Sequence, residues 1–182
     1  MALSLGHRKS EDLDFFFPDG LEEADFINQA QSKKLDLVLL HQTSAHTVLL
    51  VDKVKVDLIR ERIPLRFPLR LLHPQMTKLK MADPRDIGRM KILSIGSRGS
   101  KKDFIDLFCL TREVISLETL LAMAMEESHG IRYSKIHFLK GIVDFEEADL
   151  ESEPAMIWNV SWAEIKDVLL EEVKEIAKKI VE

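Results

Sequence analysis

The chain contains very little cysteine, with Cys109 as the single thiol among 182 residues. An internal disulfide framework is therefore excluded, and one thiol suits a reducing compartment, so we expect a cytoplasmic protein. No apolar run reaches the roughly 18 residues that indicate a membrane span, and the N-terminus lacks the basic and apolar regions of a signal peptide. We therefore expect no membrane partner.

An excess of positive charge is also missing, because the formal net charge is −5. This balance argues against binding of nucleic acid over the whole surface, although a local cluster of Lys and Arg would be enough for a phosphate contact. Residues 60–70, RERIPLRFPLR, form such a cluster, with four arginines against the single acid Glu61. Two interpretations stay open with equal weight: a phosphate-binding patch and a solvated, proline-punctuated connection.

The first part of the chain has mixed helix and strand patterns. Residues 21–34 have the spacing of a short amphipathic helix. HTVLLV and VKVDLIR are typical of two strands of a hairpin that turns at Asp52 and Lys53. From about residue 83 the pattern becomes helical, with expected helices at 83–97, 101–110, 116–127, 131–141 and 161–181. The sequence predicts an α+β fold, in which a small mixed β-sheet core (1–82) precedes a helical C-terminal domain (83–182).

Three aspartates have the spacing of a metal cradle. Asp12 and Asp14 lie at the start of a strand-like run, where residues i and i+2 share a face and Leu13 points towards the core. In VKVDLIR, alternation places Asp57 on the polar face of a later strand. Carboxylates that converge on one sheet face repel each other unless cations compensate them, and Mg²⁺ prefers such oxygen ligands. A pair of acids at a strand end is otherwise often only solvated.

The chain resembles the AbiEii/AbiGii-type nucleotidyltransferases of the DNA polymerase β-like superfamily. The resemblance rests on ALSLGHRKSEDLDFF, VKVDLIR, DIGRMKILSIGSRGSKKDFIDLFCL and HFLKGIVDFEEAD, which occur in the family's order over residues 2 to about 149. Relatives carry a glycine-rich phosphate-binding element before the first of these stretches, and this sequence begins at Met1 without it. The resemblance implies an N-terminally truncated nucleotidyltransferase core.

The resemblance also implies roles for individual residues. Asp12, Asp14 and Asp57 would bind Mg²⁺ or Mn²⁺ and act in catalysis. Lys91 would contact the triphosphate, and Asp106 would belong to the active site. Further substrate contacts are expected from Arg8, Arg98, Lys102 and Lys140. Without the family, the two helices that carry Lys91 and Asp106 would be interpreted as an ordinary salt-bridged surface.

The function that the resemblance implies is transfer of a nucleotidyl group from an NTP to a hydroxyl of RNA, such as the tRNA 3′ end, or of a protein. The chain would be the toxin of a toxin–antitoxin or abortive-infection system, with an antitoxin as partner. One alternative is a catalytically inactive remnant that acts as a binding module. Another is a glycosyltransferase that uses the two acids at residues 12 and 14 to hold Mn²⁺, although few residues precede them.

Overall fold

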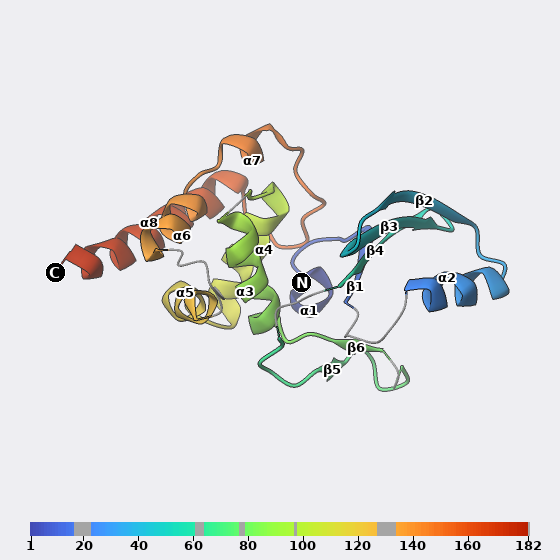
Figure 1. The fold of residues 1–182 in the computed structure, drawn as a ribbon. Coiled ribbons are helices and arrows are strands. Elements are labelled where there is room, and N and C mark those ends of the chain that lie inside the picture. The colour runs from blue at the N-terminus through green and yellow to red at the C-terminus, as the bar shows by residue number, and fades with distance from the viewer. Residues whose placement is uncertain (17–22, 61–63, 77–78, 97, 127–133, 182) are drawn as a thin grey trace. The chain divides into compact units, whose positions relative to one another are not determined.

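A computed structural model describes residues 1–16, 23–60, 64–76, 79–96, 98–126 and 134–181. The chain forms two compact units, which are described separately: residues 10–64, here called the sheet unit, and residues 1–9 with 65–182, here called the helical unit. Figure 1 gives the labels of their elements. The expected domain boundary between residues 82 and 83 stays a prediction, because compactness alone does not define a domain.

The sheet unit contains a four-stranded mixed sheet and one helix. Strand β4 pairs in parallel with β1 and in antiparallel with β3, and β3 pairs in antiparallel with β2, which gives the order β1-β4-β3-β2. This is the small mixed sheet that the sequence predicts. Its elements are β1 (Asp12–Phe16), α2 (Glu23–Ser32), β2 (Leu37–Gln42), β3 (His46–Val51) and β4 (Val54–Ile59).

The hairpin between β3 and β4 turns where the sequence predicts. Asp52 and Lys53 both have positive φ, 48° and 68°, as a two-residue turn of type I′ requires. The side chain of Asp52 holds the turn by accepting a hydrogen bond of 2.8 Å from the backbone N–H of Asp36. This turn fixes the register of β3 against β4 and therefore the face on which Asp57 lies.

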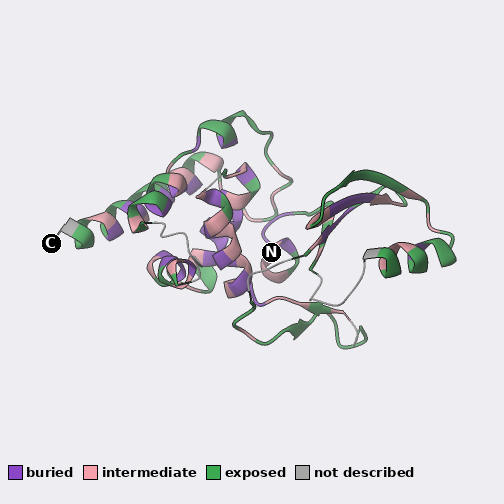
Figure 2. Cartoon of the chain, in the orientation of Figure 1, coloured by how far each residue is buried: buried purple, intermediate pink, exposed green. Residues whose placement is uncertain are grey.

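One face of the sheet carries the small apolar core of this unit. Leu49, Val56 and Leu58 are buried there, and the partly buried side chains of Phe15 and Phe26 pack against them. Leu13 is the β1 partner of the buried Val56 and so lies on this face, as predicted, but it is 42% exposed because β1 is an edge strand. The other edge strand, β2, is exposed over most of its length (Figure 2).

The helical unit contains the expected helices and two short ones that the sequence analysis does not predict, α1 and α7. Parts of the expected helices at 97, 127 and 131–133 lie outside the described residues. The elements are α1 (Ala2–Leu5), β5 (Arg70–Leu71), β6 (Lys80–Met81), α3 (Pro84–Ile95), α4 (Lys101–Glu113), α5 (Leu117–Met125), α6 (Lys135–Ile142), α7 (Glu146–Leu150) and α8 (Trp162–Val181).

Local signals explain where two of these helices begin. Asp83 caps α3 by accepting a hydrogen bond of 3.0 Å from the N–H of Arg85, and Pro84 occupies the first helical position, where no N–H is needed. Ser100 and Asp103 form a reciprocal capping box at the start of α4. These caps fix the ends of the two helices that carry Lys91 and Asp106.

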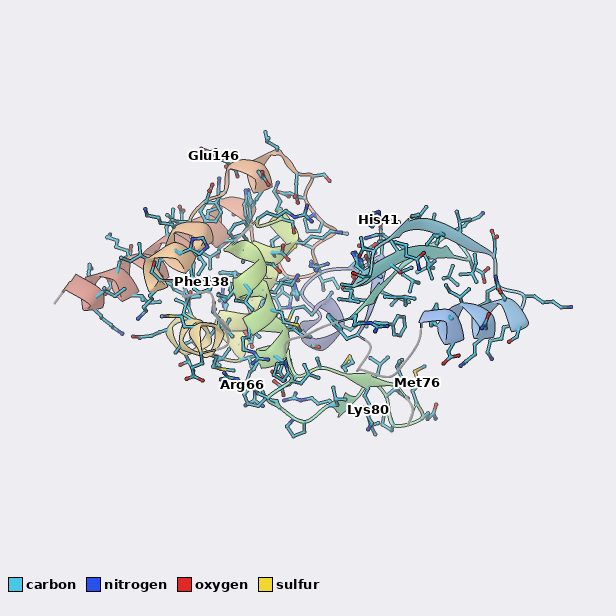
Figure 3. All side chains as sticks on the ribbon, in the orientation of Figure 1. His41, Arg66, Met76, Lys80, Phe138 and Glu146 are labelled. Carbon is cyan, nitrogen blue, oxygen red and sulfur yellow. The ribbon has the colours of Figure 1, made fainter. Side chains whose placement is uncertain are left out.

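A large apolar core joins α3, α4, α5, α6 and α8. Figure 2 shows the buried sides of these helices, and Phe138 of α6, labelled in Figure 3, is 1% exposed. Gly141 allows α6 to lie close to α3, because a Cβ there would meet the carbonyl oxygen of Ile95 at 2.9 Å. Cys109, expected in the core, is fully buried, and this burial raises the pKa of its thiol to about 12.

Candidate active site

The three aspartates of the predicted metal cradle lie on neighbouring strands of the sheet unit. In the parallel pairing of β1 with β4, Asp14 is the partner of Asp57, and Asp12 is the partner of Lys55. Because paired residues on adjacent strands share a face, Asp12, Asp14 and Asp57 all lie on the face opposite the apolar core. The structure therefore places these three predicted residues on the same face of the sheet.

Asp57 is almost fully buried, and both of its carboxylate oxygens accept hydrogen bonds from cationic or polar side chains. His46 Nε2 lies 2.7 Å from Oδ1, and Lys55 Nζ lies 2.9 Å from Oδ2. The His46 and Lys55 side chains are 40% and 45% exposed, so both partners lie between Asp57 and solvent. The carboxylate is held in a fixed orientation by two groups that solvent can reach.

Lys55 is electrostatically coupled to all three acids. Its hydrogen bond to Asp57 raises its pKa more than burial lowers it, and the charges of Asp57, Asp12 and Asp14 raise this pKa further. The positive charge of Lys55, on the same strand as Asp57, therefore offsets part of the negative charge of the three aspartates.

Neither Lys55 nor His46 is among the site residues predicted from the sequence. Alternation in VKVDLIR already places Lys55 on the face of Asp57, and the hairpin register then places His46 beside them.

The donor set fits a hard divalent cation, since carboxylate oxygens are the ligands that Mg²⁺ and Mn²⁺ prefer. Within the described part of the chain, however, no three His, Cys, Asp or Glu side chains gather closely enough to hold a metal ion. Beside Asp57 Oδ2 the structure has the Lys55 ammonium, at 2.9 Å.

A second group of predicted residues lies in the helical unit and is buried or partly buried. Asp106 of α4 is 0% exposed, and its carboxylate accepts from His7 Nε2 at 2.8 Å and from Arg8 Nε and Nη2 at 2.8 and 3.0 Å. Lys91 Nζ, on α3, lies 2.9 Å from Asp106 Oδ2 and 2.6 Å from Asp103 Oδ1. These five residues, His7, Arg8, Lys91, Asp103 and Asp106, are called the buried ion network below.

The pKa shifts in the buried ion network show that its ion pairs outweigh the cost of burial. Burial alone would raise the pKa of Asp106, but hydrogen bonds from His7 and Arg8 and the charge of Lys91 bring it well below its usual range. Burial likewise opposes the charge of Lys91, yet Asp106 and Asp103 raise the pKa of this amine. Both groups are held in their charged forms.

The network therefore joins the N-terminal GHR segment to α3 and α4. In this structure Arg8, Lys91 and Asp106 are bound to one another or to their neighbours. Their expected roles in catalysis and substrate binding stay predictions.

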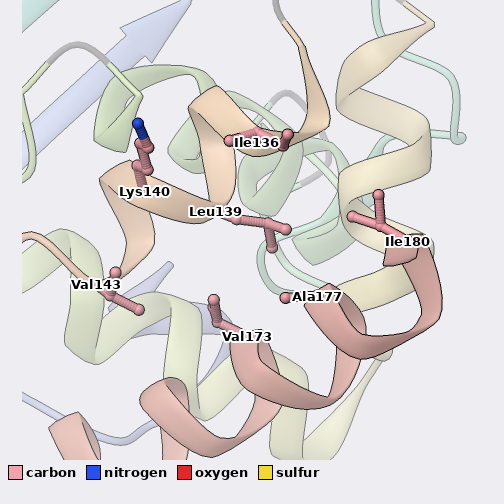
Figure 4. A pocket seen from close by; sticks show the side chains of 7 residues that line it. All are labelled: Ile136, Leu139, Lys140, Val143, Val173, Ala177 and Ile180. Carbon is pink, nitrogen blue, oxygen red and sulfur yellow. The ribbon is translucent and has the colours of Figure 1, made fainter. Parts of the chain in front are cut away.

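The remaining predicted substrate contacts lie on the surface of the helical unit. Arg98 and Lys102 are exposed, and Lys140 lies beside an apolar pocket of about 280 Å³ between α6 and α8. Figure 4 shows the Lys140 ammonium directed away from the α8 side chains. The pocket is lined by Ile136, Leu139, Lys140, Val143, Val173, Ala177 and Ile180. Such a lining does not favour a triphosphate.

Two of the four arginines at residues 60–70 form ion pairs with acids. Arg66, labelled in Figure 3, forms an ion pair of 2.8 Å with Glu126. Arg70 forms one of 2.6 Å with Asp83. Arg60 is exposed, whereas position 62 lies outside the described residues. For Arg66 and Arg70 the structure favours a structural connection over a phosphate-binding patch.

Comparison with known proteins identifies the family. Residues 1–179 match the model of the family described as nucleotidyl transferase AbiEii toxin, type IV toxin–antitoxin system. The chain belongs to this family. It is thus a nucleotidyltransferase by family, as the sequence resemblance predicts.

The chain is also similar to one curated protein and to two solved structures. The chain is 31% identical over 180 residues to the uncharacterized protein aq_aa25 of Aquifex aeolicus, a match that covers 96% of this chain and 83% of that protein. The crystal structure of JHP933 from Helicobacter pylori matches 94% of this chain and 77% of its own, with a TM-score of 0.56 and 17% identity. Another H. pylori structure, of a protein provisionally named a nucleotidyltransferase, matches 98% of this chain and 84% of its own, with a TM-score of 0.58 and 18% identity. At these identities the two structures support the fold, which confirms the predicted α+β class.

No helix in the described ranges combines the length and the apolar character that crossing a bilayer requires.

Proposed function

We propose that the chain transfers a nucleotidyl group from an NTP to a hydroxyl group at the 3′ end of tRNA, with the acid face of the sheet unit as the reaction centre. The observation that carries this proposal is the placement of Asp12, Asp14 and Asp57 on one face of paired strands in a member of a nucleotidyl transferase family. In this proposal the activity is that of a toxin, and an antitoxin is its natural partner.

The three aspartates would hold Mg²⁺ or Mn²⁺. When bound, such ions neutralise charge on the triphosphate and favour the departure of pyrophosphate. The protein's own residues supply orientation and a proton acceptor. The acceptor hydroxyl oxygen forms a bond to the α-phosphorus, the bond from that phosphorus to the β-phosphate bridging oxygen breaks, and the hydroxyl proton passes to Asp57.

His46 has a positioning role in this scheme. Its Nε2–H donates to Asp57 Oδ1 at 2.7 Å, which leaves the remaining lone pairs of the carboxylate to accept the proton. The half-exposed position of His46 and Lys55 keeps Asp57 within reach of a substrate from solvent.

The proposal is tested by incubating the purified chain with each NTP, radiolabelled at the α-phosphate, together with Mg²⁺ and total tRNA. We expect one NTP to label RNA, and Asp14→Asn to abolish the labelling. Asp25→Asn, which removes an exposed carboxylate from α2 in the same unit, is the matched control and should label like the wild type.

If Asp14→Asn labels RNA as strongly as the wild type does, the acid face takes no part in the reaction. Absence of both NTP binding and label transfer would overturn the proposed activity and favour a binding module. If protein becomes labelled in place of RNA, the transfer reaction is supported, but its acceptor is a protein hydroxyl and not tRNA.

A further inference from the structure

One corner of the acid face is occupied by a cation that belongs to the chain itself. The β1–β4 register places four charged residues at adjacent positions, with Asp12 beside Lys55 and Asp14 beside Asp57. Neighbouring strands lie about 4.8 Å apart and alternate residues of a strand about 7 Å apart, so the four side chains share a small area. Three negative charges and one positive charge therefore meet on the same face.

The Lys55 ammonium directly contacts one of the oxygens expected to bind metal. Its Nζ lies 2.9 Å from Asp57 Oδ2, and Asp12 is the partner of Lys55 in the strand register. Asp57 is buried, whereas the Lys55 side chain is 45% exposed and is attached to the sheet by a long flexible stem. The ammonium can therefore leave Asp57 for solvent, while the carboxylate stays in place.

We propose that Lys55 is an internal counter-ion that occupies the cation position of the acid face and must be displaced from Asp57 when a divalent ion binds. This inference rests on the proposed function and deepens it, since it assigns a residue that sets the affinity of the site for metal. In the metal-free protein Lys55 prevents repulsion among the aspartates, and on metal binding its ammonium is released towards solvent or a bound triphosphate.

The first test measures Mn²⁺ binding to the metal-free full-length chain by the electron paramagnetic resonance signal of free Mn²⁺. Lys55→Met keeps the length of the stem and removes the charge, so Mn²⁺ no longer competes with an ammonium. We expect the Kd for Mn²⁺ to fall about five- to tenfold, the effect of removing a partly exposed ion pair. Lys33→Met is the matched control, because it removes an exposed lysine of the same unit and leaves Lys55 in place.

A second readout follows Lys55 itself in the wild-type protein. Acylation by an amine-reactive reagent, mapped by mass spectrometry, should be slow at Lys55 in metal-free protein because the amine is paired with Asp57. We expect the rate to rise when Mn²⁺ is added at constant ionic strength, whereas Lys33 should react equally with and without the ion.

The two failures can be told apart. If the wild type binds Mn²⁺, Asp57→Asn loses it and Lys55→Met binds no tighter, the counter-ion role is overturned and the proposed metal site stands. If neither the wild type nor Lys55→Met binds Mn²⁺, the proposed metal site is overturned together with the inference. Binding by Lys55→Met alone would support the inference in its strongest form.

Discussion

The acid face of the sheet unit and the buried ion network of the helical unit both pair aspartates with cations, but they differ in exposure. Asp106 is fully buried and receives hydrogen bonds and charge from three basic residues, which are themselves largely shielded from solvent. Asp57 is buried too, yet its partners His46 and Lys55 are both more than one third exposed.

Because of this difference in exposure, the ion-pair partners of Asp57 can be replaced more easily than those of Asp106. Replacement of the partners of Asp106 would require the N-terminal segment, α3 and α4 to separate, because His7, Arg8 and Lys91 come from different parts of the unit. Replacement of the partners of Asp57 requires only side-chain rotation on the sheet. We infer that the buried ion network serves mainly the fold and that the acid face serves chemistry.

The largest effect that tests this comparison is expected from Asp106→Asn. The variant leaves the buried Arg8 without its negative partner and Lys91 with Asp103 alone, and breaking a buried pair typically costs about 3–5 kcal/mol. The free energy of unfolding, measured by urea denaturation, should fall by this amount. Asp167→Asn, at an exposed position of α8, should change it by less than about 0.5 kcal/mol.

A stable Asp106→Asn protein that had lost transfer activity would contradict the comparison, because it would assign the network to catalysis. A destabilised protein that retains activity at low temperature would support it.

Asp57→Asn should show the opposite pattern. The amide keeps the shape of the carboxylate and can still bond its half-exposed neighbours, so we expect a loss of stability of about 1 kcal/mol or less. Label transfer to RNA should fall at least about 100-fold, because the variant removes the proposed proton acceptor. Both quantities are measured on one preparation, with Asp25→Asn as the control. A large loss of stability with activity retained in the folded fraction would reverse the roles of the two aspartates.

Acid should weaken the helical unit through Asp106. Its pKa is lowered in the folded protein, so the unfolded state binds the proton more readily. The stabilisation is present above the unfolded value of about 3.9 and is lost as the pH falls below it towards the folded value. Denaturation at a series of pH values should show stability falling between about pH 5 and pH 2, and Asp106→Asn should flatten this dependence. An unchanged slope in the variant would show that other carboxylates control acid unfolding.

Local patterns predicted much of the fold and part of the site. The alternation in VKVDLIR and the turn at Asp52 and Lys53 were sufficient to place Asp57 on the polar face of β4, because both depend on neighbouring residues. The parallel pairing of β1 with β4 was not predictable in the same way, since it joins residues more than forty positions apart. Alternation predicts the face of each acid within its own strand, and the family resemblance assigns all three acids to one metal site, but neither specifies that β1 lies next to β4.

The partners of the predicted residues were harder to foresee than the residues themselves. His7 and Asp106 are separated by 99 positions, and nothing in either segment specifies the other. A lone buried histidine and a helical aspartate have several common partners, so tertiary packing decides between them. Lys55 is different, because its position two residues before Asp57 predicts a shared face, and two opposite charges on one face of a strand can form the ion pair that the structure shows.

The smallest expected effect concerns the turn that positions the acid face. Asp52 and Lys53 occupy a left-handed conformation that costs energy in residues with a Cβ, least for Asp and Asn. Lys53→Gly removes this cost and should stabilise the sheet unit by up to about 1 kcal/mol. The strain that a positive φ causes in a residue with a Cβ outweighs the extra conformational entropy that glycine gives the unfolded chain. Lys53→Ala removes the lysine but keeps the Cβ, and should leave stability nearly unchanged. Thermal denaturation of the two variants separates backbone strain from side-chain charge. Because neither change touches Asp57, His46 or Lys55, the Mn²⁺ affinity should stay the same, and a shift in it would show that the turn controls the register on which the acid face depends.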